Sequence, residues 1–187
     1  MSAITPLQPW TNDEFFHWQT DQPDRYELVD GFPLKMMTGA SRRHDTIVVN
    51  IIVALGNRLR GRPCQPFTAD GAVETRPGQI RRPDVGVDCG PTQPDAMLAS
   101  EATVIFEVLS PSTRDFDRLR KIAEYKGMAF LRHIVLVEPE RAYATLWSRI
   151  GQTAWDERVV EGLDAVIALP AIGVDLPMRE IYDRLLG

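Results

Sequence analysis

The sequence has no long apolar run and none of the signature motifs of the common hydrolases. No hydrophobic stretch approaches the roughly 20 residues of a membrane span, and residues 1–10 lack the basic and apolar segments of a secretory signal. We therefore expect a cytoplasmic protein with no membrane partner. The absence of H-E-x-x-H, G-x-S-x-G and Walker sequences argues against zinc proteases, serine hydrolases and nucleotide hydrolases.

Cysteine is scarce, since Cys64 and Cys89 are the only two. They form no C-x-x-C pair, and neither has a histidine beside it. This spacing indicates neither a zinc site nor a disulfide framework, so we expect two plain thiols. Lysine is scarce as well, because only three of the 21 basic residues are lysines, namely Lys35, Lys121 and Lys126.

The net charge of −5 argues against a general polyanion binder, because Lys and Arg supply most non-specific affinity for nucleic acid. A metal-dependent nuclease, however, concentrates acid at its centre and cations at its rim, so the local pattern matters more than the sum. Basic residues cluster at 42–44, 58–62, 81–82 and 114–121. Each cluster has two open interpretations: contact with phosphate, or a solvated surface with partners among local acids.

Length and periodicity predict one α/β domain over residues 1–187, with 44% apolar and 25% charged residues. A short helix is expected at 10–18, a hairpin around Asp30-Gly31 at 25–37, and a core helix with an apolar face at 44–60. Further strands are predicted at 71–76, 84–89, 103–109, 133–138 and 143–148, and further helices at 115–126 and 177–186. Because a helix separates two of these strands while hairpins join others, the central sheet should be mixed and flanked by helices.

A carboxylate interrupts the apolar strand predicted at 103–109. Burying Glu107 without a partner would cost several kcal/mol, so a counter-ion, a hydrogen bond or a metal is needed. Asp84 follows a proline at the head of the strand predicted at 84–89 and could face it. Two acids on adjacent strands suit Mg²⁺, which takes oxygen ligands and keeps several waters.

The helix after Glu107 carries three further polar groups on one stripe. Asp117, Lys121 and Tyr125 lie at i, i+4 and i+8, so they could overlook the strand acids. Two alternatives stay open from spacing alone. Asp117 and Lys121 could form only a surface ion pair, and Tyr125 could simply fill the seam between helix and sheet, which is the interpretation we favour for it.

These residues resemble the Uma-two family of endonucleases, within the PD-(D/E)XK nuclease superfamily. The resemblance rests on Arg82-Pro83-Asp84-Val85, on Glu107-Val108-Leu109-Ser110-Pro111-Ser112-Thr113, and on Asp117, Lys121 and Tyr125. It extends over nearly the whole chain, with Tyr26-Glu27-Leu28-Val29-Asp30-Gly31 in the place of the opening hairpin and His44 in the place of a core-helix histidine. The resemblance implies a restriction-endonuclease-like fold.

The resemblance also implies a mechanism. Asp84, Glu107 and the Val108 carbonyl would hold Mg²⁺, with Mn²⁺ as a substitute. The superfamily expects lysine two residues after the acid, but Leu109 stands there, so the cationic role is assigned to Lys121. Glu27 is either an outer ligand or an exposed strand residue. His44 is either a group that orients a ligand or phosphate, or a cap or packed residue.

The function expected from these residues is Mg²⁺-dependent hydrolysis of DNA phosphodiester bonds, with Asp84, Glu107 and Lys121 as catalytic residues. The main alternative is a catalytically silent protein of the same fold that binds nucleic acid or protein, and Leu109 favours it. A hydrolase of a smaller phosphoester is a third interpretation. A homodimer is expected because two symmetric sites suit the cutting of both strands of a duplex.

Overall fold

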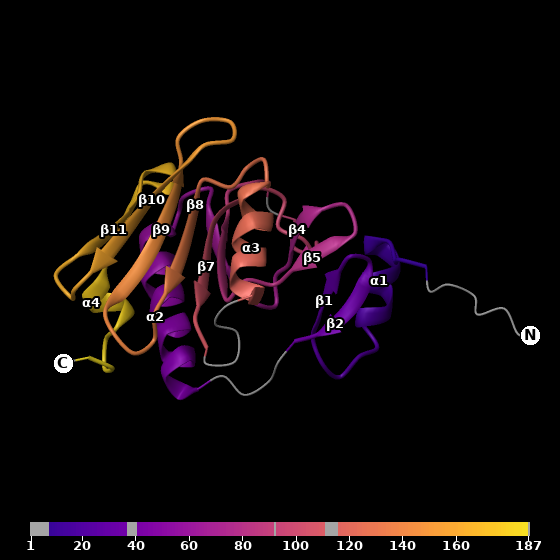
Figure 1. The fold of residues 1–187 in the computed structure, drawn as a ribbon, viewed down its shortest axis with the longest axis horizontal. Helices are drawn as coiled ribbons and strands as arrows, with labels where there is room; N and C mark the ends of the chain where they lie inside the picture. The colour runs from indigo at the N-terminus through magenta and orange to yellow at the C-terminus, as the bar shows by residue number, and fades with distance from the viewer. Residues whose placement is uncertain (1–7, 37–40, 92, 111–115, 187) are drawn as a thin grey trace, which may run out of the picture.

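The computed structural model describes the chain except residues 1–7, 37–40, 92, 111–115 and 187, and except the side chains of residues 116–118 (Figure 1). A central sheet of six strands runs through it. In their order across the sheet, these strands are β10 (Trp155–Glu161), β9 (Tyr143–Arg149), β8 (His133–Val137), β7 (Ala102–Val108), β6 (Val85–Asp88) and β3 (Gln65–Thr68).

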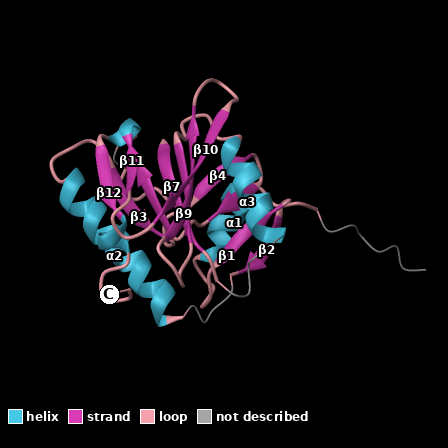
Figure 2. Ribbon diagram, turned by 60° about the vertical axis from the view of Figure 1, so that its left-hand side comes forward, coloured by secondary structure: helices cyan, strands magenta, loops and turns pink. Residues whose placement is uncertain are grey.

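The sheet is mixed, as the sequence predicts. β7 and β8 pair in parallel through the crossover helix α3 (Phe116–Lys126), and the other neighbours pair antiparallel. β7 is buried on both faces, since α2 (Arg42–Leu59) and α3 lie on opposite sides of the sheet (Figure 2). This double burial accounts for the nearly continuous apolar run of β7.

Helix α2 forms because its apolar residues recur on one face. Ile47, Ile51, Leu55 and Leu59 are spaced by four residues, and all are buried in the larger core cluster. The Ser41 side chain accepts a hydrogen bond from the backbone N–H of His44 and so caps the helix, which begins at Arg42, two residues before the predicted start. The cap places His44 in the first turn.

A second sheet, of four strands, is formed by the N-terminal part of the described chain. Its order is β2 (Phe32–Lys35), β1 (Tyr26–Val29), β5 (Gln79–Arg81) and β4 (Val73–Arg76). The predicted hairpin is present, with positive φ at Asp30 (52°) and Gly31 (81°), as its tight turn requires. The predicted first helix is α1 (Asn12–Gln19), which begins with a capping box between Thr11 and Glu14.

The C-terminal end differs from the prediction. A two-stranded ribbon of β11 (Val166–Leu169) and β12 (Val174–Pro177), joined by the 3₁₀ turn η1 (Pro170–Ile172), leads to α4 (Met178–Ile181). The helix predicted over 177–186 is therefore wrong in length. The Tyr182 hydroxyl donates to the Glu138 carbonyl at 2.6 Å, and Arg184 has a φ of 63°, so the chain turns away after one helical turn.

The prediction of two plain thiols is wrong, because Cys64 and Cys89 form a disulfide. Gln65 pairs with Asp88 across β3 and β6, so the two cysteines lie opposite each other just beyond the strand ends, with Cα atoms 4.0 Å apart. A separation of 25 residues gives no sign of this contact. Strand register alone creates it.

Five strands have no counterpart in the prediction: β3, β5, β10, β11 and β12. β3 contains a proline, β5 has three residues, and β10 is a largely exposed edge strand whose charged residues mask its alternation. Weak apolar periodicity explains why sequence reasoning missed these three. Within the described residues, no helix is long and apolar enough to cross a membrane.

Candidate active site

The two acids singled out in the sequence lie opposite each other at the ends of two adjacent strands of the central sheet. Val85 pairs with Phe106 between β6 and β7, which places Asp84 opposite Glu107. Asp84 Oδ2 accepts a hydrogen bond from the Val108 N–H at 2.7 Å, so its carboxylate bridges the strand ends. The structure thereby brings together Asp84, Glu107 and the Val108 backbone, the three residues that the resemblance implies as ligands.

His44 reaches this cluster from the first turn of α2. Its Nε2 lies 3.3 Å from Asp84 Oδ2, and both side chains are largely buried. The hydrogen bond with Asp84 is the main cause of a raised pKa at His44, against the opposing effect of burial, and a hydrogen bond to the Val108 backbone adds to it. His44 therefore contacts two of the three expected ligands, and it is not the cap of the helix.

Glu107 is the most perturbed acid of the site. Burial is the main cause that raises its pKa to about 7, and the nearby Asp84 charge adds to this effect. Lys121 and Tyr125 oppose the shift: the Tyr125 hydroxyl donates to Glu107 Oε1 at 2.6 Å, and Lys121 Nζ lies 3.7 Å from the same oxygen. Tyr125 is also fully buried, so it both packs the seam and binds the carboxylate.

Lys121 lies between Glu27 and Glu107. Its Nζ is 3.1 Å from Glu27 Oε1 and 3.7 Å from Glu107 Oε1, so it connects the hairpin acid to the strand acid. Leu109, which stands in the place of the superfamily lysine, is 5% exposed and packs into an apolar cluster with Ile122 and Tyr125. The side chain of Asp117 lies outside the described residues.

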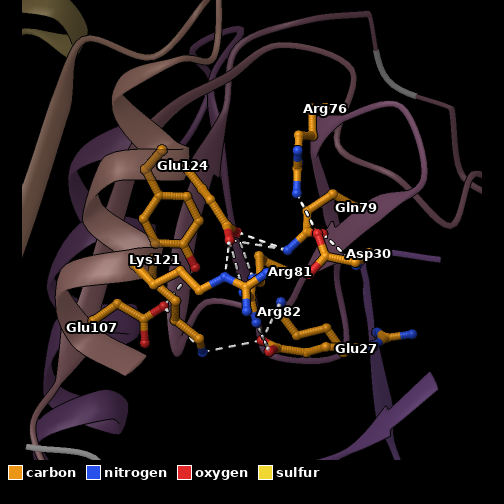
Figure 3. A network of polar contacts seen from close by, with 11 residues as sticks. Glu27, Asp30, Arg76, Gln79, Arg81, Arg82, Glu107, Lys121 and Glu124 are labelled. Carbon is orange, nitrogen blue, oxygen red and sulfur yellow. Dashed lines mark hydrogen bonds and ion pairs between the residues drawn. The ribbon is translucent and has the colours of Figure 1, made fainter. Parts of the chain in front are cut away.

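Glu27 is buried, which makes the interpretation of an exposed strand residue wrong. Its carboxylate binds Arg81, whose side chain is 1% exposed and also binds Glu124 (Figure 3). Gln79 donates to both oxygens of Glu124 at 3.1 Å. Sequence reasoning missed Arg81, Glu124 and Gln79 as parts of the site's surroundings, since only the contact between β5 and α3 brings them together.

Both arginines of the basic cluster at 81–82 are buried and bind groups within the protein. Arg81 is enclosed by acids, and Arg82, 5% exposed, donates through its side chain to the backbone carbonyls of Tyr26 and Asp70. A partner among local acids is therefore found for Arg81, whereas Arg82 is buried and bonds to backbone carbonyls, which neither interpretation of the cluster included.

The donor set fits a hard cation. Two carboxylates and a backbone carbonyl offer only oxygen, the preference of Mg²⁺. The closest contacts of the described residues fall on one oxygen of each acid: Val108 N–H and His44 on Asp84 Oδ2, and Tyr125 and Lys121 on Glu107 Oε1. The described part of the chain contains no group of three or more His, Cys, Asp and Glu side chains suited to a metal, so the carbonyl and waters would complete the shell.

A mixed sheet with a strand–helix–strand crossover and an acid pair on adjacent strands defines the class as a restriction-endonuclease-like nuclease fold. A crystal structure described as a putative nuclease belonging to DUF820, from Anabaena variabilis, shares this fold with a TM-score of 0.73 at 16% identity, over 95% of this chain and 100% of that one. The chain belongs to the Uma2 family, described as "Putative restriction endonuclease", whose model matches residues 12–179.

A curated relative has the same extent. It is the "Uncharacterized protein slr1290" of Synechocystis sp., 26% identical over 186 residues, which are 98% of this chain and 97% of the relative. Its name assigns no activity. The family and the fold therefore identify a nuclease-like protein, and the chemistry has to be argued from the site.

Proposed function

We propose that this protein is a Mg²⁺-dependent endonuclease that hydrolyses phosphodiester bonds of DNA. The observation that carries the proposal is the meeting of Asp84, Glu107 and Lys121, from two strands and a helix, at one largely buried point. Membership of a family described as "Putative restriction endonuclease" supports DNA as the substrate class. Mn²⁺ is expected to substitute for Mg²⁺.

The residues that would hold the metal are Asp84, Glu107 and the Val108 carbonyl. When bound there, Mg²⁺ supplies Lewis-acid polarisation of the scissile phosphate and a lowered pKa for a bound water. Asp84 is oriented for this task by the Val108 N–H and by His44, and Glu107 by the Tyr125 hydroxyl. These contacts hold the carboxylates in place before a ligand arrives, which is how a preformed site avoids reorganisation during the reaction.

Lys121 supplies the positive charge that the strand itself lacks. An ammonium group 3.7 Å from Glu107 can stabilise negative charge that develops on the phosphate and help to orient the attacking water. The pKa of Glu107, at about 7, means that a proton occupies this acid in a large fraction of molecules at neutral pH. Glu107 would have to lose that proton for its carboxylate to hold a metal.

Two other functions would give different results in the test described below. A silent nuclease-fold protein would bind DNA or protein without cutting, and the buried Leu109 is the feature that favours it. A hydrolase of smaller phosphoesters would cut a model diester but not a duplex. We also expect a homodimer in the cytoplasm, which sedimentation velocity would test for the oligomeric state.

The test is calorimetric titration of Mg²⁺ and Mn²⁺, with plasmid cleavage on the same samples. The wild type is compared with an Asp84→Asn/Glu107→Gln variant. The matched control, Asp156→Asn/Glu161→Gln, removes two acids from the far edge strand β10, where each pairs with a surface arginine. Binding and cutting that vanish only in the site variant would support a metal nuclease. Binding without cutting favours the silent alternative, and no saturable binding sinks the proposed metal site.

A further inference from the structure

Arg81 is a cation sealed inside the protein between the N-terminal sheet and α3. Its Nη1 donates to Glu27 Oε2 at 2.7 Å, and its Nε and Nη2 donate to the two oxygens of Glu124 at 2.7 and 2.9 Å (Figure 3). A two-pronged bond to Glu124 fixes the plane of the guanidinium. The fixed guanidinium in turn sets the direction of the Glu27 carboxylate.

The second oxygen of Glu27 is fixed from the backbone. Oε1 accepts a hydrogen bond from the Arg82 N–H at 3.1 Å, and the same oxygen lies 3.1 Å from Lys121 Nζ. The side chain of Glu27 is 6% exposed, so water competes little for it. Glu27 is thus a rigid acid whose one oxygen is pointed at the lysine.

Lys121 needs such an anchor because its ammonium group sits at the end of a flexible four-carbon stem. Its Nζ lies closer to Glu27 than to Glu107, at 3.1 Å against 3.7 Å. Both oxygens of Glu27 are already engaged by cations or by a backbone N–H, which leaves it poorly suited to bind a metal. Burial favours the neutral acid, but Lys121 and Arg81 outweigh burial and lower the pKa of Glu27, so the anchor stays charged.

We infer that Glu27 is a positioning residue: it holds the ammonium group of Lys121 beside Glu107 and acts on the reaction through that lysine, as neither a metal ligand nor a group that touches DNA. This inference rests on the proposed function, since it assigns Lys121 a role in cleavage. It also explains how a nuclease could keep a positioned cation at its site although Leu109 stands where the superfamily has lysine. The hairpin, through Glu27, would supply the rigidity that a strand position otherwise gives.

A double-mutant cycle tests the inference through kinetics. Glu27→Gln should lower kcat for plasmid cleavage roughly 10- to 100-fold, the scale of a misplaced reacting group, while the KM for DNA and the Mg²⁺ affinity stay within about two-fold. In a Lys121→Met background, the same Glu27→Gln change should alter kcat less than about two-fold, because the group through which it acts is gone. Equal losses of kcat in both backgrounds would overturn the inference.

Asp30→Asn is the matched control. It removes another acid of the same hairpin, whose side chain contacts Arg76 and Arg120. Its effect on kcat should be the same with and without Lys121, whereas that of Glu27→Gln should not. If Glu27→Gln does not fold, Glu27→Asp replaces it in the cycle, since the shorter acid keeps the charge for Arg81 and withdraws from the lysine. An Asp30→Asn result identical to that of Glu27→Gln would overturn the positioning role.

A second measurement does not depend on cleavage. The chain has only three lysines, so ¹³C-lysine labelling gives three side-chain Cε signals. The Lys121 signal should be rigid in the wild type and mobile in Glu27→Gln. The signals of Lys35, paired with Asp24, and Lys126, over the Trp147 ring, serve as internal references. If the wild type cuts no DNA but this change is seen, the positioning holds and the nuclease proposal fails. Unchanged Lys121 mobility overturns the positioning even if DNA is cut.

Discussion

Replacing Arg81 with methionine should destabilise the protein strongly. The substitution keeps an unbranched side chain of similar length but removes the charge between Glu27 and Glu124, whose side chains are 6% and 11% exposed. Removing one partner of a buried ion pair costs about 3–5 kcal/mol, because it leaves an uncompensated buried charge. For a chain of this size, such a loss lowers the melting temperature by roughly 10 °C.

The loss of unfolding free energy should depend on pH, in a direction set by the pKa values of the two acids that bind Arg81. In the wild type the pKa values of Glu27 and Glu124 are lowered although burial opposes this, mainly through Lys121 and Arg81 for Glu27 and through Arg81 for Glu124. Their stabilisation is therefore present above the unfolded pKa, about 4.3, and is lost as pH falls. Without Arg81, burial raises both folded pKa values, so the variant gains stability as pH falls. The difference in unfolding free energy should be largest near pH 7 and shrink toward pH 4.

The assay is urea unfolding followed by circular dichroism at pH 7 and pH 4.5. Arg120→Met is the control, since Arg120 also contacts Glu124, at 3.1 Å, but has a side chain that is 36% exposed. That variant should lose less than about 1 kcal/mol, as partly solvated pairs do. A loss below about 1 kcal/mol for Arg81→Met at pH 7, or a loss independent of pH, would show that Arg81 is not the counter-ion described above.

Other expectations concern the site and the crosslink. Asp84→Asn alone should abolish Mg²⁺ binding and cleavage yet leave the urea midpoint nearly unchanged, and normal cleavage would show that the assignment is wrong. Since burial is the main cause of the pKa of about 7 at Glu107 and a metal binds only the carboxylate, Mg²⁺ affinity should rise about tenfold from pH 6 to pH 8 in calorimetry; a constant affinity would contradict this. Lys121→Ala should reduce kcat more than metal affinity, whereas equal losses would indicate that the lysine organises the site. Cys64→Ala/Cys89→Ala should lose about 3 kcal/mol of unfolding free energy, and two reactive thiols in the unreduced, denatured wild type would rule out the crosslink.

Local patterns in the sequence were sufficient for most of the framework. The Asp30-Gly31 turn needs positive φ values that few other pairs adopt, and the spacing of Ile47, Ile51 and Leu55 defines a helical face. The residues of these features are close in sequence, so their meaning does not depend on distant parts of the chain. The predicted closing helix was too long because its end is set by a distant part of the chain. Tyr182 bonds to Glu138 instead of continuing the helix.

In the candidate site, too, the features that depend on local sequence were predictable and those that depend on distant residues were not. A lone acid in the apolar strand β7 had to have a partner, because an unpaired buried charge is too costly. That physical requirement made Glu107 visible in the sequence. The partners themselves were only partly visible: Asp84 and Lys121 stood out through their spacing and the family resemblance, whereas for Arg81 contact with phosphate and a partner among local acids both stayed open.

What the sequence by itself determined is therefore the main helices, the first hairpin, the strongly apolar strands and the presence of a charged centre, since hydrophobic periodicity, turn chemistry and the cost of burial act locally. What only the tertiary structure decided is which charges meet. Strand register brought Cys64 to Cys89, and the packing of α3 against the N-terminal sheet brought Glu27 to Arg81 and Lys121. Ion pairs and crosslinks depend on distances of a few ångströms between atoms far apart in the chain, and no local pattern sets those distances.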